Sequence, residues 1–196
     1  MRFPVILVAA GMVGAALVGC SSGGSDGQQS SSAAPAPGGP WATSDCAVIA
    51  PPATGASLPE GAVVEGEVAT TATVGTAPAV AVLEGAVPVT RLVVSDVVTG
   101  SGTEVAPGAT VTVEYCGVGL ASGAIFDSSW ARGEPATFPL SGVITGWQDG
   151  IPGMQPGGRR LLIIPADQAY GDTPPPGSGI GPGETLVFVV DMISSP

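Results

Sequence analysis

The chain has 196 residues, and its 16 acidic residues outweigh five arginines, giving a formal net charge of -11 with no histidine and no lysine. A P-loop requires lysine, a Ser-His-Asp triad requires histidine, and zinc sites usually require histidine or several cysteines, so these sites are excluded. The acidic balance also argues against a nucleic-acid partner. The 31 glycines and 20 prolines, beside a hydrophobic fraction of 44%, indicate a β-rich domain joined to a flexible segment.

The N-terminus has the features of an export signal. Arg2 gives a positive start, and the apolar stretch from Val5 to Val18 is shorter than the about 20 residues that span a bilayer. The sequence Leu17-Val18-Gly19-Cys20 resembles the bacterial lipobox, in which the cysteine receives diacylglycerol and the chain is cleaved before it. We therefore predict a lipoprotein signal peptide over 1–19, lipidation of Cys20, and an extracytoplasmic protein lipid-anchored to the bacterial cell membrane. An ordinary signal peptide with an incidental cysteine and a single-pass anchor are the alternatives.

Two segments separate this signal from the most readable part of the chain. Residues 20–45 are rich in Ser, Gly, Gln, Ala and Pro without an apolar period, and we predict a disordered, flexible tether. Residues 46–87 contain short runs with β character, such as 79–82, and no helical period. We interpret 46–87 as an irregular β-rich extension that adds strands to the sheet of the following domain. A separate small domain is the alternative.

With the lipidation cysteine set aside, Cys46 and Cys116 remain as a candidate disulfide in an oxidising compartment. Strand alternation places Tyr115 on one face of the segment 110–116 and Cys116 on the other. That second face also carries Glu114 and is expected to face solvent, so that Cys116 can reach a segment lying over the sheet. Two free thiols are the alternative.

Residues 88–196 are predicted to form an α+β domain. A short helix is expected around 146–151, because Thr145 and Gln148 have the spacing of a capping box and Pro152 ends the apolar pattern. Antiparallel strands and one short helix form a fold in which the sheet buries one face on the helix. The strands are expected at 92–98, 111–118, 161–164 and 186–193, the last with Leu186, Phe188, Val190 and Met192 on one face.

Five motifs make this domain recognisable by their order and spacing. They are Val113-Glu114-Tyr115-Cys116-Gly117, Phe126-Asp127-Ser128-Ser129, Val143-Ile144-Thr145-Gly146-Trp147, Ala169-Tyr170-Gly171 and Thr185-Leu186-Val187-Phe188. Together they resemble the FKBP family of peptidyl-prolyl cis/trans isomerases over roughly 88–196. The resemblance implies an antiparallel β half-barrel wrapped around one short α-helix, with an apolar pocket between them.

The resemblance also implies catalytic roles for four residues. Trp147 forms the apolar floor under the proline ring of the substrate. Asp127 lies at the rim, near the carbonyl that twists, and is held by Arg132 and by the hydroxyl of Tyr115. The hydroxyl of Tyr170 donates a hydrogen bond to a substrate carbonyl.

Further residues contact the substrate in this interpretation. The backbone N–H of Ile144 donates to a second substrate carbonyl, and Ile180 covers one edge of the pocket. The resemblance gives substrate-binding roles to Phe126, Arg132, Phe138, Val143, Ile144, Ile180 and Phe188.

The chain departs from the family pattern at three places, one of which is the stretch 140–142, about two residues shorter than in compact eukaryotic members. Ala136 stands where family members usually have an aromatic residue, with Phe138 two positions further on. One wall of the pocket is therefore expected to be thinner. The loop over 172–183 is so rich in proline and glycine that family contacts are difficult to transfer to it.

The resemblance implies an isomerase for X-Pro segments of unfolded or exported proteins, inhibited by rapamycin-type macrolides. It needs no cofactor and no metal, because rotation about the X-Pro bond transfers no group. We expect a monomer that reaches the membrane only through the lipid on Cys20. Two alternatives stay open: a non-catalytic module that binds proline segments or acts as a chaperone, and a structural envelope lipoprotein.

Overall fold

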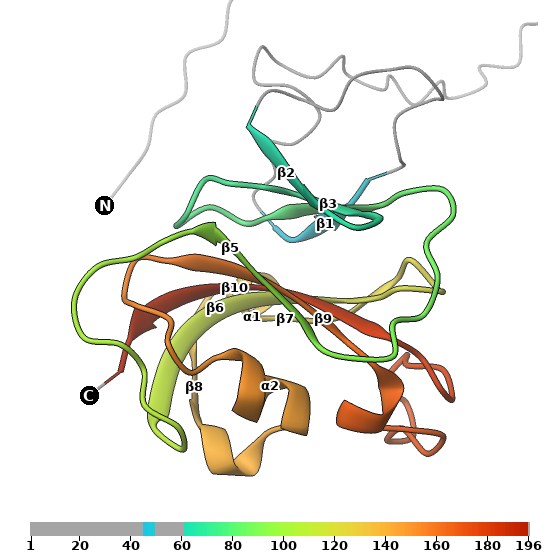
Figure 1. The fold of residues 1–196 in the computed structure, drawn as a ribbon. Helices are drawn as coiled ribbons and strands as arrows, with labels where there is room; N and C mark the ends of the chain where they lie inside the picture. Colours follow the sequence, from blue (N-terminus) through green and yellow to red (C-terminus); the bar gives the residue numbers. More distant parts are fainter. Residues whose placement is uncertain (1–44, 50–60, 196) are drawn as a thin grey trace, which may run out of the picture. The chain divides into compact units, whose positions relative to one another are not determined.

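A six-stranded antiparallel sheet is the framework of the second half of the chain (Figure 1). The structure is a computed structural model that describes residues 45–49 and 61–195. The strand order is β5-β9-β10-β6-β7, and β8 pairs with the earlier part of β6. The strands are β5 (Val93–Val98), β6 (Thr110–Gly119), β7 (Ile125–Ser128), β8 (Ala136–Pro139), β9 (Arg159–Ile164) and β10 (Leu186–Ser194).

Several sequence predictions fall on residues that the structure does not describe. The signal peptide over 1–19, the lipidation site at Cys20 and almost all of the tether over 20–45 lie outside the described residues. Within 45–49 and 61–195, no helix combines the length and the apolar character needed to cross a membrane.

One face of the large sheet packs against helix α2 (Thr145–Gly150) and forms the main core (Figure 1). The predicted alternation in the last strand is confirmed, because Leu186, Phe188, Val190 and Met192 all belong to this core. Two glycines on α2 allow the close approach. A Cβ on Gly146 would lie 2.3 Å from Cγ2 of Ile164, and one on Gly150 would lie 2.8 Å from Cδ2 of Leu162. The helix is therefore seated directly on β9.

The short helices differ from the sequence prediction. Helix α2 begins at Thr145, one residue early, and the residue before it, Ile144, makes no side-chain capping bond. The predicted capping box is therefore wrong: the amide Nε2 of Gln148 reaches back and donates to the Val143 carbonyl at 2.8 Å. The structure adds a single-turn helix α1 (Ser129–Arg132) and two 3-10 turns, η1 (Leu140–Gly142) and η2 (Ala166–Gln168).

The extension forms a second sheet of four strands and adds none to the large sheet. Its order is β1-β4-β3-β2, with β1 parallel to β4 and the other pairs antiparallel. The expectation that the extension adds strands to the domain's sheet is therefore wrong. Short strands can pair with one another as well as with a larger sheet, and here the four strands of the extension pair with one another. The strands are β1 (Ala47–Val48), β2 (Ala62–Glu65), β3 (Val68–Thr71) and β4 (Ala79–Val82).

This second sheet covers the outer face of the large sheet, the face turned away from α2 (Figure 1). A cluster of apolar side chains fills much of the space between the two sheets, so the outer face carries a second buried core. Its buried members are Cys46, Val68, Val80, Cys116, Val118, Leu120, Leu161, Ile163, Val187 and Val189.

A buried ion pair within the large sheet is hydrogen-bonded to the extension. Arg159 of β9 is fully buried, and its Nε lies 2.5 Å from Oδ1 of Asp191 on β10. The guanidinium donates further to the carbonyls of Thr71 and Thr76, and the Gly75 N–H donates to Asp191. A buried charge pair is tolerable only when its remaining hydrogen-bonding groups are satisfied, and here the extension supplies these partners.

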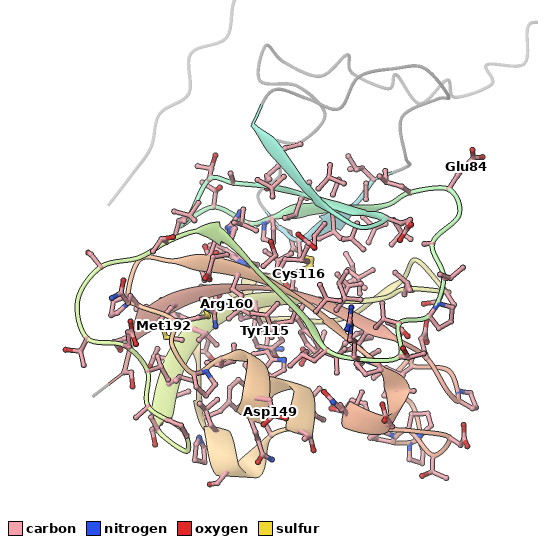
Figure 2. All side chains as sticks on the ribbon, viewed as in Figure 1. Glu84, Tyr115, Cys116, Asp149, Arg160 and Met192 are labelled. Carbon is pink, nitrogen blue, oxygen red and sulfur yellow. A yellow bond between two sulfur atoms is a disulfide. The ribbon has the colours of Figure 1, made fainter. Side chains whose placement is uncertain are left out.

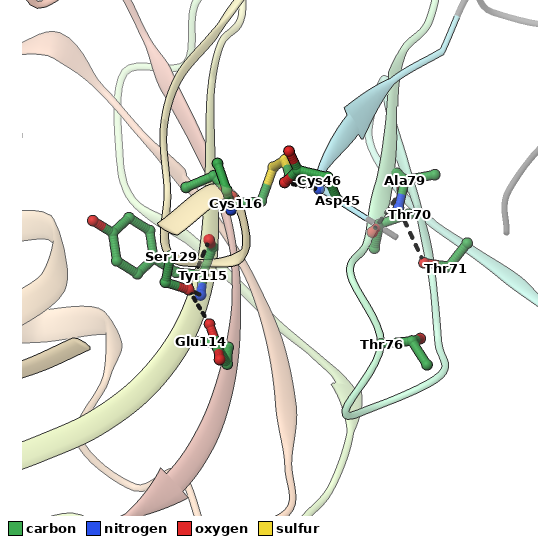
Figure 3. Close-up of a disulfide and its surroundings, with 12 residues drawn as sticks. Asp45, Cys46, Thr70, Thr71, Thr76, Ala79, Glu114, Tyr115, Cys116 and Ser129 are labelled. Carbon is green, nitrogen blue, oxygen red and sulfur yellow. Dashed lines mark hydrogen bonds between the residues drawn. A yellow bond between two sulfur atoms is a disulfide. The ribbon is translucent and has the colours of Figure 1, made fainter. Parts of the chain in front are cut away.

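A disulfide between Cys46 and Cys116 adds a covalent link between the sheets (Figure 3). It joins the residue before β1 to the middle of β6 across a sequence separation of 70 residues, with the Cα atoms 5.9 Å apart. The expectation that Cys116 faces solvent is wrong. Its side chain is fully buried, because the extension lies over this face of the strand.

Candidate active site

A pocket of about 480 Å³ opens on the inner side of the large sheet, beside the N-terminus of α2. Figure 2 shows Tyr115 on this side of the sheet and Cys116, the next residue, on the other. The pocket brings together nine of the eleven residues predicted for it and adds Gly142. The lining is Tyr115, Phe126, Asp127, Phe138, Gly142, Val143, Ile144, Trp147, Tyr170 and Phe188.

Aromatic rings packed edge to face form the base of the pocket. The ring of Trp147 lies 5.5 Å from that of Tyr115, 5.9 Å from Phe138 and 5.3 Å from Phe188, at interplanar angles of 89°, 89° and 83°. Phe126 makes a similar contact with Phe188 at 5.4 Å. Because these are favoured aromatic geometries, each ring fixes its neighbours. Trp147 is 4% exposed and still borders the hollow, so the base is rigid and apolar.

A glycine on β6 makes room for two of these rings. A Cβ on Gly117 would lie 2.7 Å from Cζ of Phe126 and 3.0 Å from Cε1 of Phe188. The rings therefore rest directly on the strand backbone. Gly117 stands in one of the five motifs, but no role is predicted for it from the sequence. Its place two residues after Tyr115 on the same strand puts both residues on the pocket face, and this is the signal that identifies it.

Three polar side chains form a network at one rim of the pocket. The hydroxyl of Tyr115 donates to Asp127, the guanidinium of Arg132 donates to the same hydroxyl at 2.8 Å, and Arg132 pairs with Asp127 at 2.5 Å. The guanidinium also lies 5.4 Å from the centre of the Tyr115 ring. Both charged side chains are 44% exposed, so the pair adds little to stability and chiefly fixes the geometry of the rim.

The network and its burial keep the Tyr115 hydroxyl protonated. The pKa of Tyr115 is raised to about 12, first by burial and then by its hydrogen bond to Asp127, while Arg132 acts in the opposite direction. Hydrogen bonds to Tyr115 and Asp127 raise the pKa of Arg132 above its usual value. Around neutral pH the Tyr115 hydroxyl therefore remains a hydrogen-bond donor.

A buried serine supports the strand at this rim. Oγ of Ser129 accepts from the Tyr115 N–H at 2.7 Å and donates to Glu114. Strand β7 ends at Ser128, so the Ser129 side chain takes the place of the next ladder bond to β6. Ser129 is the last residue of the motif that begins at Phe126, but no role is predicted for its side chain from the sequence.

Two predicted pocket residues do not line the hollow. Arg132 contacts the pocket only through Tyr115 and Asp127. Ile180 is half-buried in the loop before β10 and packs against the inner core. Tyr170 does line the pocket and is 36% exposed at its mouth.

The structure also locates the departure at Ala136. Ala136 begins β8, opposite Val113 of β6, and is partly buried against the core. Phe138, two residues further along the same strand, lines the pocket and packs 6.0 Å from the Tyr115 ring. An aromatic ring is thus present on this wall, supplied from another position.

A small pocket with a rigid aromatic base, aliphatic walls and a few polar groups at its rim is a binding site for a compact apolar group next to polar atoms.

The comparisons with known proteins identify the family. The family model described as FKBP-type peptidyl-prolyl cis-trans isomerase matches residues 102–193. A Corynebacterium glutamicum protein named "Probable FK506-binding protein" is 54% identical over 105 residues, which are 53% of this chain and 86% of that protein.

Two further relatives extend the comparison. The "FK506-binding protein" of Streptomyces anulatus is 48% identical over 109 residues, covering 55% of this chain and 88% of that protein. The "Outer membrane protein MIP" of Legionella longbeachae is 44% identical over 95 residues, covering 48% and 40%. The chain belongs to the FKBP-type peptidyl-prolyl cis-trans isomerase family, which is a family of enzymes.

Proposed function

We propose that this protein accelerates rotation about X-Pro bonds in unfolded or newly exported polypeptides outside the cytoplasm. The observation that carries the proposal is the pocket of about 480 Å³ with the Trp147 indole at its base. Its apolar lining suits a proline ring, its size leaves room for the neighbouring peptide groups, and its rim groups suit the carbonyls on either side of that ring.

The chemistry is a change of solvation and requires no proton transfer. The barrier to X-Pro rotation is about 18–20 kcal/mol because twisting the amide removes its resonance. The planar amide carries more charge separation than the twisted one, so an apolar pocket destabilises the planar form more. Each 1.36 kcal/mol gained in this way corresponds to about a tenfold rate increase. The rigid aromatic base provides these apolar surroundings before the substrate binds.

Two donors can orient the substrate in this proposal. Among the described residues, nothing accepts a hydrogen bond from the N–H of Ile144 or from the hydroxyl of Tyr170. Both residues border the pocket, so both donors are available to substrate carbonyls. Asp127, held by Arg132 and Tyr115, also borders the pocket, and in this proposal it lies near the twisting carbonyl.

The location outside the cytoplasm rests on two features of this chain. The N-terminal segment ending at Cys20 has the pattern of a lipoprotein signal, and the lipid on Cys20 would hold a monomer at the membrane. The Cys46–Cys116 disulfide belongs to an oxidising compartment. The name of the Legionella relative, an outer membrane protein, agrees with this placement.

The test is an isomerase assay of the mature protein on a proline tetrapeptide. We expect turnover that a chelator does not affect and that a rapamycin-type macrolide inhibits. The rate should vary little between about pH 6 and 8, because no group of the proposed mechanism has an ordinary pKa there. Binding of the peptide without acceleration would select the non-catalytic module, and a steep bell-shaped pH profile would contradict the mechanism.

A further inference from the structure

The loop between η2 and β10 carries Tyr170, which lines the pocket, and Ile180, which packs against the core that carries the pocket rings. Its two ends are tied together by the Gly183 N–H, which donates to the Gly171 carbonyl at 2.9 Å. The Ile180 N–H donates to Oγ of Ser178 at 3.3 Å. A loop so rich in glycine and proline has few side chains of its own to hold it, so its order depends on such bonds.

Glu184, at the end of this loop, ties it to the rest of the domain. The residue is 8% exposed, and its Oε2 accepts from the Gly181 N–H at 2.6 Å. Its Oε1 accepts from the N–H of Ser122, 62 residues away in the turn between β6 and β7, at 3.0 Å. The carboxylate therefore bridges Gly181, the residue after Ile180, and the turn that follows β6.

The surroundings of Glu184 are shaped for a charged carboxylate. Burial alone would raise its pKa, but hydrogen bonds from Gly181, from the Ser122 side chain and from the backbone of Ser122 and Ala121 outweigh burial and lower it. Gly119 also leaves room for this carboxylate, because a Cβ at that position would lie 2.2 Å from Oε1 of Glu184. Only a residue without a side chain at 119 leaves room for the bridge.

We infer that Glu184 is a positioning residue, whose bridge from Gly181 to Ser122 holds Ile180 against the core that carries the pocket rings. The inference rests on the proposed isomerase function. Glu184 lines a separate hollow of about 380 Å³ that shares no lining residue with the pocket, so it acts on substrate only through the loop. Ile180 packs against the core that carries the pocket rings, and Gly179, beside it, approaches Phe126.

The experiment compares Glu184→Ala, Ile180→Ala and the double variant in the proline-peptide assay. We expect each single variant to lower kcat/KM by about three- to tenfold, chiefly through a higher KM, as for one lost apolar contact. The double variant should be no worse than either single variant, because misplacing Ile180 has no further effect once its side chain is gone. Glu184→Gln, which retains one acceptor and the side-chain volume, should give an intermediate loss and covers the case in which the alanine variant does not fold.

A matched control separates positioning from stability. Thr70→Val removes a buried hydrogen bond in the extension, to the Ala79 carbonyl, and should destabilise the protein while leaving kcat/KM unchanged. Amide exchange at Gly181 and Ser122 should be about tenfold faster in the Glu184 variants and unchanged in Thr70→Val. Wild-type turnover with no loss in Glu184→Ala, or strictly additive losses in the double variant, would overturn the inference. Absence of wild-type turnover would instead reject the proposed function.

Discussion

At the scale of single residues, burial and the polar network at the pocket rim together raise the pKa of Tyr115. The hydroxyl is shared between Asp127 and Arg132, and burial of the ring disfavours the phenolate. The free energy of unfolding should therefore depend on alkaline pH through this group. The chain has two tyrosines and no lysine, so few other groups titrate in that range.

We predict that stability falls as pH rises from about 10 to 12 and that Tyr115→Phe removes most of this fall. The unfolded chain ionises its tyrosine near pH 10, whereas the folded pKa is about 12. The proton is held more tightly when folded, so the contribution is complete below pH 10 and is lost towards pH 12. Urea unfolding of both proteins at several pH values measures this; equal slopes for wild type and Tyr115→Phe would count against it.

Sequence reasoning placed most of the pocket residues because their motifs keep order and spacing along one strand, one helix start and one loop. It missed Glu184, since a lone acidic residue before the last strand gives no sign of the N–H groups that it will meet. Those donors come from Ser122, 62 residues earlier, and from a turn in the loop. Contacts of this kind depend on tertiary structure and leave no local pattern.

At the scale of elements, the packing of α2 against β9 determines where the indole of Trp147 lies. Gly146 faces Ile164 and Gly150 faces Leu162, both fully buried. The cation Arg160, also from β9, donates to the carbonyls of Gly150 and Pro152 at the end of the helix. A helix of this length is not stable alone, so these contacts fix it.

Gly146→Ala should therefore displace the helix although alanine favours helix formation. The new methyl group would meet Ile164 at 2.3 Å, and overpacking of this kind costs about 1–3 kcal/mol. We expect a lower melting temperature and a loss of kcat/KM, because Trp147 moves with the helix. Asp149→Ala, an exposed position on the same helix, is the control and should change neither quantity appreciably. Unaltered kcat/KM in Gly146→Ala would show that the close packing of α2 against β9 is not required for activity.

The sequence predicted the helix and the four main strands of the domain, because their apolar periods are long or their ends are marked. It failed on the extension because alternation shows that a run is a strand but does not show which strand it pairs with. Val68 and Val80 face the large sheet, yet their strands bond to each other. Pairing partners of short strands are set by the packing of the whole unit.

At the scale of the whole molecule, the extension and the isomerase domain share a core. The large sheet buries apolar side chains on both faces, one against α2 and one against the second sheet. The Cys46–Cys116 bridge crosses the second interface, and so do the hydrogen bonds that the Arg159–Asp191 pair of the large sheet makes to the extension. Residues 88–196 alone would therefore expose a large apolar surface.

Removing the disulfide should destabilise this arrangement without changing the pocket. Closing a loop of 70 residues corresponds to about 4 kcal/mol in the chain-entropy description. We expect Cys46→Ser to lower the free energy of unfolding by about that amount, with kcat/KM of the folded protein retained, because Tyr115 faces the pocket and Cys116 faces the extension. Wild type in reductant should match the variant. Identical unfolding curves for wild type with and without reductant would be inconsistent with this role.

The most direct test of the account compares kcat/KM for a proline tetrapeptide in wild type, Trp147→Ala and Trp147→Leu. An apolar floor that favours the twisted amide predicts a loss of at least about tenfold in Trp147→Ala and partial retention in Trp147→Leu, which restores apolar volume. Wild-type rates in a folded Trp147→Ala protein would contradict the claim that this indole forms the catalytic surface.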